Sequence, residues 1–450
     1  MFFRAQRWLS LFIISTFVSS CTTTWNARTT DSVILAGSTP ITVTPSPTPP
    51  LAVLTPQPEL RDSPACLPYT EFEWFIPSEQ ILAAWCPTLP EPLLENTLLL
   101  VPLIPQSSLN SPQTGIHILF LLSIPDSQTV SAISQVLTTF LGRGLYPTAT
   151  IAMAEDIASV TRRGTAGREA LAYAEANGYD LIFAVGPSTT EFIRQNYAEG
   201  ILPVVTMLSQ DPVLLGMTND YQSGSGNNIA YTTVNVPVDV QMTYYRQLVP
   251  ELQNIVIIYD FNDAIARQTQ VNPFGQYALT NTLNIMHIAI LRMDDPDAAR
   301  AELQDKFPHI LVTLRQIDSG NSRSIFLVAN SPLINQIFDM IYTLAGDIPV
   351  VSLLPELVQP GQVSAVMSVG ISSQSNAVLA ADFAIHILLE GTDPGTLPVG
   401  TISPPNLAVN FAAARHIGLR IPFTLFENAT QIYDASGRLV REDGHNLTNP

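Results

Sequence analysis

The run Ile116-His-Ile-Leu-Phe-Leu-Leu122 is apolar over the length of a strand, and the pattern around it predicts the fold. The stretch that follows, residues 128–141, has apolar side chains every three or four positions, which is typical of one face of a helix. A strand that is apolar throughout needs cover on both faces. We therefore expect a parallel sheet that lies between helices.

This alternation of strand and helix continues to about residue 207 and then restarts near residue 238. Residues 308–317 fit either a helix or an extra strand. The other expected strands share a continuous apolar character and lie at 148–153, 181–185, 202–207, 254–259, 286–291, 324–328, 350–353, 363–369 and 407–411. We predict an α/β chain with two consecutive doubly wound units, each built on a parallel sheet.

Composition excludes several classes of protein. The formal net charge is −18, from 38 acidic and 20 basic residues, and no basic stripe is present. A phosphate backbone would be repelled, so we expect no nucleic-acid partner. Charged residues make up only 13% of the chain and apolar residues 46%, which indicates a folded protein with a large buried fraction.

The N-terminus has the features of an export signal. Arg4 and Arg7 precede the apolar run 8–18, which is too short to span a bilayer. Val18-Ser19-Ser20-Cys21 resembles the bacterial lipobox, which implies a signal peptide at 1–20 and a lipid on Cys21. The protein is then extracytoplasmic and anchored to the cell membrane by that lipid. The alternative is an ordinary secretory signal with a chance cysteine.

Residues 21–65 are rich in Pro and Thr, as in the run 44–50, and we expect an extended tether there. Residues 66–114 are apolar but interrupted by prolines, and we interpret them as a small N-terminal extension. Cys66 and Cys86 could form a disulfide in an oxidising compartment, or remain as two buried thiols. Neither a metal nor a cofactor is expected, because no His or second Cys pair stands at ligand spacing.

Four stretches between about 115 and 425 carry a resemblance to a known family. The chain resembles the periplasmic-binding proteins of ABC transporters, in particular the branch associated with aromatic amino-acid uptake. The four stretches keep the order and spacing of that branch: Pro203-Val-Val-Thr-Met-Leu-Ser-Gln-Asp-Pro-Val213; Gly226-Asn-Asn-Ile-Ala230; Ile385-His-Ile-Leu-Leu-Glu-Gly391 with Leu397-Pro-Val399; and Leu407-Ala-Val-Asn-Phe-Ala-Ala-Ala-Arg-His-Ile-Gly-Leu-Arg-Ile-Pro422.

The resemblance implies a type I periplasmic-binding-protein fold, with two lobes joined by crossing strands. Lobe one would contain residues 115–234 plus 371–398, and lobe two residues 235–370 plus 399–430. Residues 431–450 would form a C-terminal hairpin and tail. A small-molecule ligand, an amino acid or a similar solute, would be trapped between the lobes and passed to an ABC permease.

The resemblance also implies the ligand-binding candidates, which lie at the ends of the expected strands, where open α/β sheets bind ligands. In lobe one these are Ser123, Ser188, Thr189, Ser209 and Asp211, and in lobe two they are Asp260, Asn262, Asn330 and Ser331. Two of them have structural alternatives. Ser188 could simply cap a helix, and Asp211 could brace the Asp-Pro turn instead of binding an amine.

The chain also departs from the family pattern. Ala230-Tyr231 stands where Thr-Gly is usual, Asn330-Ser331 replaces a frequent Asp, and residues 371–376 lack an aromatic pair. A site without that carboxylate lacks the usual partner of a ligand ammonium group. The identity of the ligand is therefore not carried over with the resemblance.

Two other functions were weighed. An enzyme is not expected, because the chain has no Gly-x-Ser-x-Gly elbow, no His-Glu-x-x-His and no phosphate loop. The alternative to transport is a lipoprotein that uses the same fold to regulate a cell-envelope enzyme or a sensor kinase.

Overall fold

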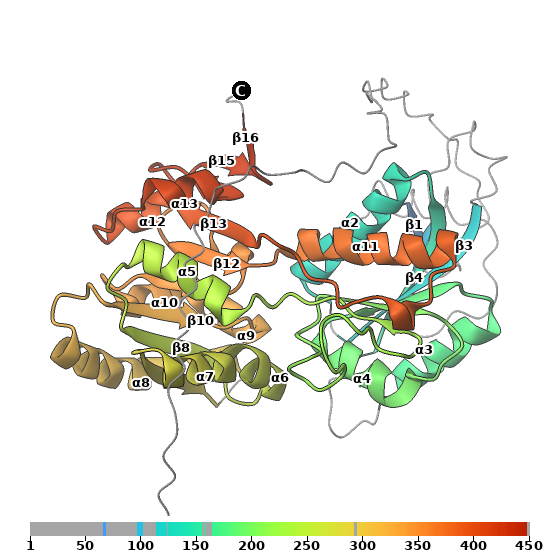
Figure 1. The fold of residues 1–450 in the computed structure, drawn as a ribbon, viewed down its shortest axis with the longest axis horizontal. Helices are drawn as coiled ribbons and strands as arrows, with labels where there is room; N and C mark the ends of the chain where they lie inside the picture. Colours follow the sequence, from blue (N-terminus) through green and yellow to red (C-terminus); the bar gives the residue numbers. More distant parts are fainter. Residues whose placement is uncertain are drawn as a thin grey trace, which may run out of the picture. The chain divides into compact units, whose positions relative to one another are not determined.

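The structure is a computed structural model that describes residues 66–68, 97–101, 114–123, 125–154, 157, 164–291 and 295–447. These residues form two mostly parallel β-sheets, each covered by helices (Figure 1). The first sheet has seven strands in the order β1-β2-β4-β3-β5-β6-β7. The second has nine, in the order β16-β15-β14-β13-β12-β11-β10-β8-β9. The predicted α/β class is confirmed.

The strands of the first sheet run parallel to their neighbours except where β2 pairs with β4. They are β1 (Cys66–Pro68), β2 (Thr97–Val101), β3 (Thr114–Leu122), β4 (Tyr146–Met153), β5 (Leu181–Val185), β6 (Val204–Met207) and β7 (Ile229–Ala230). β3 lies between β4 and β5, so the apolar run that predicted the fold is at the centre of the sheet.

Helices cover both faces of the first sheet. They are α2 (Ser127–Gly142), α3 (Thr165–Ala176), α4 (Pro187–Tyr197) and α11 (Ser373–Glu390). α2 and α11 share one core with the sheet, in which Phe120 stacks on Phe183 with ring centroids 4.9 Å apart. α3 and α4 pack on the opposite face. Burial on both faces explains why β3 is continuously apolar over residues 118–122.

The second sheet is parallel at its centre and antiparallel toward one edge. Its strands are β8 (Asn254–Asp260), β9 (Asn284–Ile290), β10 (Ser324–Val328), β11 (Val350–Ser352), β12 (Met367–Gly370), β13 (Asn406–Asn410), β14 (Gln431–Tyr433), β15 (Leu439–Glu442) and β16 (His445–Asn446). Its helices are α5 (Val238–Leu248), α6 (Ala264–Ala266), the π-helix η4 (Arg267–Val271), α7 (Asn272–Thr280), α8 (Pro296–Ile317), α9 (Pro332–Gln336), α10 (Phe338–Ala345), the 3₁₀ turn η5 (Pro355–Leu357), α12 (Phe411–His416) and α13 (Phe423–Asn428).

The antiparallel pairing of β12 with β13 differs from the sequence-based expectation of a parallel sheet. β13 is antiparallel to β12, because the chain leaves the second sheet after β12, forms α11 on the first sheet, and re-enters at the same end, where Asn406 pairs with Gly370. β14 and β15 are antiparallel because a tight turn joins them, in which the backbone N–H of Gly437 donates to the carbonyl of Asp434 at 2.9 Å. Residues 308–317, which the sequence left open, belong to the helix α8.

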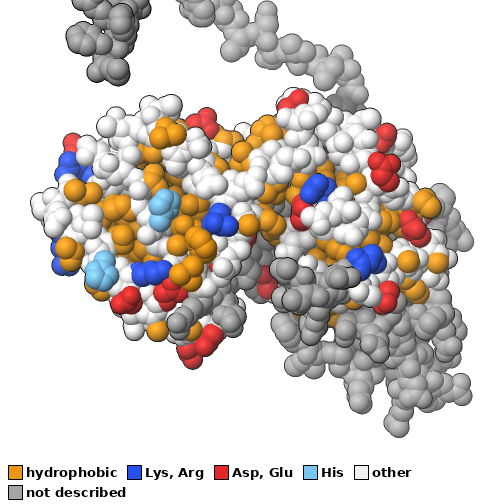
Figure 2. All heavy atoms as spheres, turned by 90° about the horizontal axis from the view of Figure 1, so that it is seen from below, with side chains coloured by type: hydrophobic (Ala, Val, Ile, Leu, Met, Phe, Trp, Pro, Cys, Tyr) orange, Lys and Arg blue, Asp and Glu red, His pale blue; other side chains and the backbone are white. Residues whose placement is uncertain are grey.

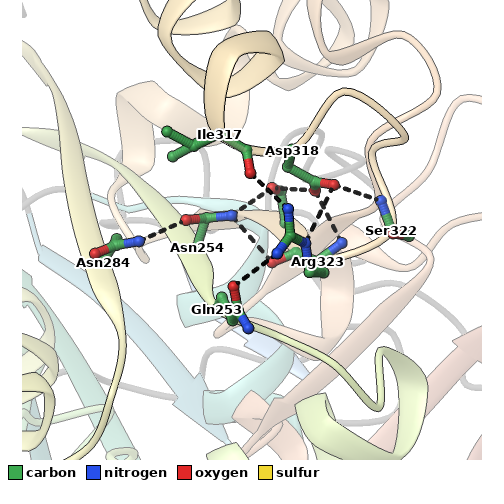
Figure 3. A network of polar contacts seen from close by, with 8 residues as sticks. Gln253, Asn254, Asn284, Ile317, Asp318, Ser322 and Arg323 are labelled. Carbon is green, nitrogen blue, oxygen red and sulfur yellow. Dashed lines mark hydrogen bonds and ion pairs between the residues drawn. The ribbon is translucent and has the colours of Figure 1, made fainter.

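A polar network closes the amino-terminal edge of the second sheet (Figure 3). The carboxylate of Asp318, just after α8, accepts hydrogen bonds from the backbone N–H of Arg323 at 2.8 Å and the Ser324 hydroxyl at 2.6 Å. The Arg323 guanidinium in turn donates to the carbonyl of Ile317 at 2.6 Å and to the side chain of Gln253 at 3.1 Å. The network fixes the end of α8 against the start of β8 and β10.

On the face drawn in Figure 2, acidic and basic side chains lie singly among neutral and apolar ones, without a continuous patch of either sign. Within the described ranges, no helix has the length and apolar character that crossing a bilayer requires. The predicted lipid site Cys21 and the predicted disulfide partner Cys86 lie outside the described residues, as does the side chain of Cys66.

Candidate ligand-binding cavity between the two sheets

Three chain segments connect the first sheet to the second: the ones after β7, after β12 and before β13. Thr232 and Gly400 pair in parallel where two of them meet. Asn376 of α11, which is completely buried, braces this region. Its side-chain oxygen accepts from the backbone N–H of Leu208 at 2.7 Å, and its amide nitrogen donates to the carbonyl of Thr233 at 3.3 Å. The crossing segment after β7 is therefore held to α11 through Thr233 and to β6 through Thr232, whose backbone N–H donates to the Thr206 hydroxyl at 2.9 Å.

A cavity of about 520 Å³ is lined by helices that cover the first sheet and by strands and loops of the second. Gln128 and Ser131 of α2 contribute from the first unit, and the start of α11 adds Ser373. The second unit contributes Asn335 of α9 and Glu356 of η5, together with the loop that follows η5 and residues of β14 and β15. This volume lies within the range of about 300–1,000 Å³ that is usual for small-molecule sites.

Glu356 connects the two units at the wall of this cavity. Its Oε1 accepts hydrogen bonds from the backbone N–H of Ser373 at 2.9 Å and from the Ser373 hydroxyl at 2.8 Å. Ser373 is the first residue of the 18-residue helix α11, whose N-terminus favours a negative charge. Oε2 of the same carboxylate is shut off from solvent and accepts no hydrogen bond. An acidic residue of the second unit thus caps a helix of the first.

The predicted site residues of the first sheet lie at the carboxyl ends of its strands, and the side chains of two of them, Ser209 and Asp211, are taken up by internal hydrogen bonds. Ser123 is partly buried just after β3. Ser188 and Thr189 lie in the first turn of α4, whose N-cap is Gly186, so Ser188 does not cap this helix. The Thr189 hydroxyl is buried without a hydrogen-bond partner. The Ser209 hydroxyl, which is inaccessible to solvent, bonds to that of Thr190 at 2.8 Å.

Asp211 has the geometry of a turn-bracing residue. One carboxylate oxygen accepts from the backbone N–H groups of Val213 at 2.9 Å and Leu214 at 3.0 Å. The other accepts from the hydroxyl of Tyr221. Burial and this contact with Asp211 raise the pKa of Tyr221 above its ordinary value. Both oxygens of Asp211 are therefore engaged within the loop, although the residue also lines two further cavities.

The predicted residues of the second sheet follow β8 and β10. Asp260 accepts from the backbone N–H of Asn262 at 2.7 Å, and the Asn262 side chain donates to the carbonyl of Leu291 at 2.8 Å. Burial is the main cause of the raised pKa of Asp260. The backbone N–H of Asn330 donates to the side chain of Gln270 at 2.7 Å. Ser331 is buried at the N-cap position of α9.

None of the nine predicted residues lines the 520 Å³ cavity, and their ligand roles remain predictions. The residues that do line it include Glu356, which sequence reasoning did not select. A signal was present: Pro355-Glu356 follows the expected strand 350–353, and ligands of open α/β sheets lie at that end of a strand. Glu442 and Asp443 also line the cavity. No sequence pattern pointed to them, because they come from a hairpin distant in the sequence.

A second cavity, of about 540 Å³, lies beside the crossing segments and has a mostly apolar lining. Its walls include Val236, Pro237, Phe274 and Tyr277, with Asp211 at its border. This cavity offers few polar groups to orient a ligand, whereas the 520 Å³ cavity offers many. The second cavity is therefore the weaker candidate for specific binding.

Comparison with known families gives a match over residues 168–433, to the family described as ABC transporter substrate binding protein. A search of curated proteins finds no match.

Solved structures support the same fold. The chain is similar to an ABC domain from Streptococcus pneumonia in complex with L-Trp, with 17% identity and a TM-score of 0.54 over 71% of this chain and 100% of the other. It is also similar to a substrate binding protein with adhesive properties from Clostridium difficile, in a ligand-free open structure, with 16% identity and a TM-score of 0.53 over 68% and 96% of the two chains. At these identities the likeness extends to the fold alone.

Proposed function

Because this chain belongs to the family of ABC transporter substrate binding proteins, we propose that it captures a small molecule between two lobes and delivers it to an ABC permease. The family has a binding role in transport and is not enzymatic, and it works outside the cytoplasm. In our proposal a lipid on Cys21 anchors the protein, and residues 21–65 hold the binding lobes away from the membrane. The ligand is an amino acid or a solute of similar size.

The observation that carries this proposal is the 520 Å³ cavity with walls from both units. A ligand that contacts only one lobe gains little, whereas a ligand enclosed by both lobes gains contacts when they close on it. The crossing segments provide the hinge for such a movement. The contact between Glu356 and Ser373 is one that closure would form and opening would break.

Thermal unfolding of the full chain with a panel of amino acids, amines, sugars and small anions tests the proposal. A ligand that binds only the folded protein stabilises it by mass action, by about 2.7 kcal/mol at a hundred times its Kd. We expect at least one compound to raise the Tm and to reduce the radius of gyration in small-angle scattering. Absence of any shift would contradict capture and would favour the regulatory lipoprotein instead.

The lipid anchor has a separate test. Labelling with radioactive palmitate in a bacterial host should mark the protein. The labelled protein should be recovered in the membrane fraction. The Cys21→Ser variant should take up no label. Labelling of that variant would place the lipid elsewhere or remove the anchor from the proposal.

A further inference from the structure

The charge of the 520 Å³ cavity is one-sided. Among the described residues that line it, Glu356, Glu442 and Asp443 are acidic, and none is Lys, Arg or His. The remaining polar lining consists of neutral hydroxyl and amide groups. A cavity with this lining attracts a cation and repels an anion, and because Glu442 and Asp443 are exposed to solvent, salt weakens this attraction.

Two of the three carboxylates come from the C-terminal hairpin. β15 ends at Glu442, and Asp443 is in the turn before β16. The family match ends at residue 433, so this acidic wall is supplied by a segment beyond it. The hairpin is held in place by backbone hydrogen bonds, from Gly444 to the carbonyl of Thr430 at 2.8 Å and from Gly361 to the carbonyl of Gly437 at 3.1 Å.

The cavity also has a surplus of hydrogen-bond acceptors. Oε2 of Glu356 and the side-chain oxygen of Asn335 are both buried without a donor. Leaving a buried acceptor unpaired costs free energy, and rotation of either side chain toward the cavity would let a ligand N–H group recover it. The pKa of Tyr433, another lining residue, is raised by burial and by the negative charge of Glu442, so Glu442 acts electrostatically on the cavity wall.

A metal ion does not fit this arrangement. Over the residues that the structure describes, no three His, Cys, Asp or Glu side chains are close enough to hold one. The carboxylates are instead spread around a space large enough for a small organic molecule. The cation that matches them is therefore an extended one with several N–H donors.

We propose that this cavity selects organic cations with protonated amino groups, and that Glu442 and Asp443 of the C-terminal hairpin provide the selecting charge. The inference rests on the proposed function, since it names the ligand class of the same cavity. The two hairpin residues attract the ammonium group, and Glu356 adds a third negative charge to the lining.

Calorimetric titration of the full chain tests this with three amino acids that share one backbone and differ in side-chain charge: L-lysine, L-leucine and L-glutamate. Putrescine, a diamine without a carboxylate, is the fourth probe. We expect the wild-type chain to bind putrescine or L-lysine at least tenfold more tightly than L-leucine, and L-glutamate most weakly. The preference should decrease as salt is added.

The decisive variant is Glu442→Gln with Asp443→Asn, which removes both charges and keeps the side-chain shapes. Asp443 has a positive φ of 47°, which Asn tolerates well, so the turn is retained. We expect this variant to bind the cationic probes about tenfold more weakly. The control is Glu251→Gln with Asp305→Asn, two exposed acids that do not line the cavity, and its affinities should change less than twofold.

The outcomes separate the two proposals. Equal affinity of the hairpin variant and the wild type for a cation would overturn the inference. A preference of the wild type for L-leucine or L-glutamate would also overturn it. In both cases the proposal that the protein captures a small molecule would stand. Absence of binding for all four probes would overturn the inference, and the larger panel described above would then decide whether capture fails as well.

Discussion

Two carboxylates, one at the amino ends and one at the carboxyl ends of the strands of the second sheet, differ in how their oxygens are hydrogen-bonded. Asp318, at the amino-terminal edge, accepts from the backbone N–H of Ser322 at 3.2 Å and has Arg323 Nε 3.7 Å away, while its other oxygen accepts two further hydrogen bonds (Figure 3). Glu356, at the carboxyl-terminal edge, has two hydrogen bonds on one oxygen and none on the other.

The difference shows where this fold is stabilised and where it remains available for a ligand. Burial alone would raise the pKa of Asp318, but hydrogen bonds from Ser324 and from the backbone of Arg323 and Ser322 outweigh it and lower that pKa. Such a carboxylate stabilises the native state and has no capacity for a ligand. Glu356 retains an acceptor beside a cavity, at the edge of the sheet where ligands of open α/β sheets bind.

Asp318→Ala should give the largest effect on stability. The side chain is only 2% exposed, and its removal leaves Arg323 and Ser324 without their partner. We expect a loss of about 2–4 kcal/mol in the free energy of unfolding, measured by urea denaturation. The control is Asp339→Ala, whose ion pair with Arg300 is formed by a side chain that is 60% exposed. That change should cost less than about 1 kcal/mol. Equal losses in the two variants would mean that the buried network adds nothing.

Gly437→Ala should have an intermediate effect on the free energy of unfolding, because it disturbs the cavity wall at the carboxyl ends of the strands. Gly437 has φ +79°, and an added Cβ would lie 2.6 Å from the backbone of Gly361, next to the loop that lines the cavity. Gly444→Ala is the matched control, with φ +78° and no atom within 4 Å of the new Cβ. Both variants carry a conformational cost of about 1–2 kcal/mol.

The steric contact should make Gly437→Ala roughly 1–3 kcal/mol less stable than Gly444→Ala. Hydrogen exchange of residues 359–364 should also become faster in the first variant alone. If the two variants unfold at the same urea concentration, the hairpin turn does not brace this loop.

Glu356→Gln should have the smallest effect on stability. The glutamine amide oxygen can take the place of Oε1 and accept both hydrogen bonds from Ser373. The amide nitrogen takes the place of Oε2, which has no hydrogen-bond partner in the wild type. We expect the free energy of unfolding to change by less than about 1 kcal/mol, whereas Glu356→Ala, which removes both bonds, should cost more. A loss in Glu356→Gln as large as that of Asp318→Ala would remove the contrast between the two edges.

The sequence predicted the α/β class because apolar periodicity reports burial directly. β3, β5, β8 and β10 are apolar at nearly every position, and each lies inside a sheet. The antiparallel edge of the second sheet could not be predicted in the same way. The direction in which β13 enters depends on where α11 packs, and periodicity carries no information on that.

The site was less accessible to sequence reasoning. The strand-end rule led to Ser209 and Asp211, but their oxygens are engaged by Thr190, Tyr221 and the backbone, which only tertiary contacts reveal. The cavity brings together residues as distant as Gln128 and Asp443. These two positions lie near opposite ends of the described chain, and no local sequence pattern links them.

The placement of α11 has a consequence for the order in which the protein can fold. Ala377, Ala380, Ala381 and Ala384 complete a core whose strands are all made by residue 230. Chains grow at about 5–20 residues per second, so the ribosome needs on the order of ten seconds to supply this helix after β7. During that interval α2 alone covers this face of the newly made sheet, and a chain that stops before residue 373 leaves part of its apolar surface exposed permanently.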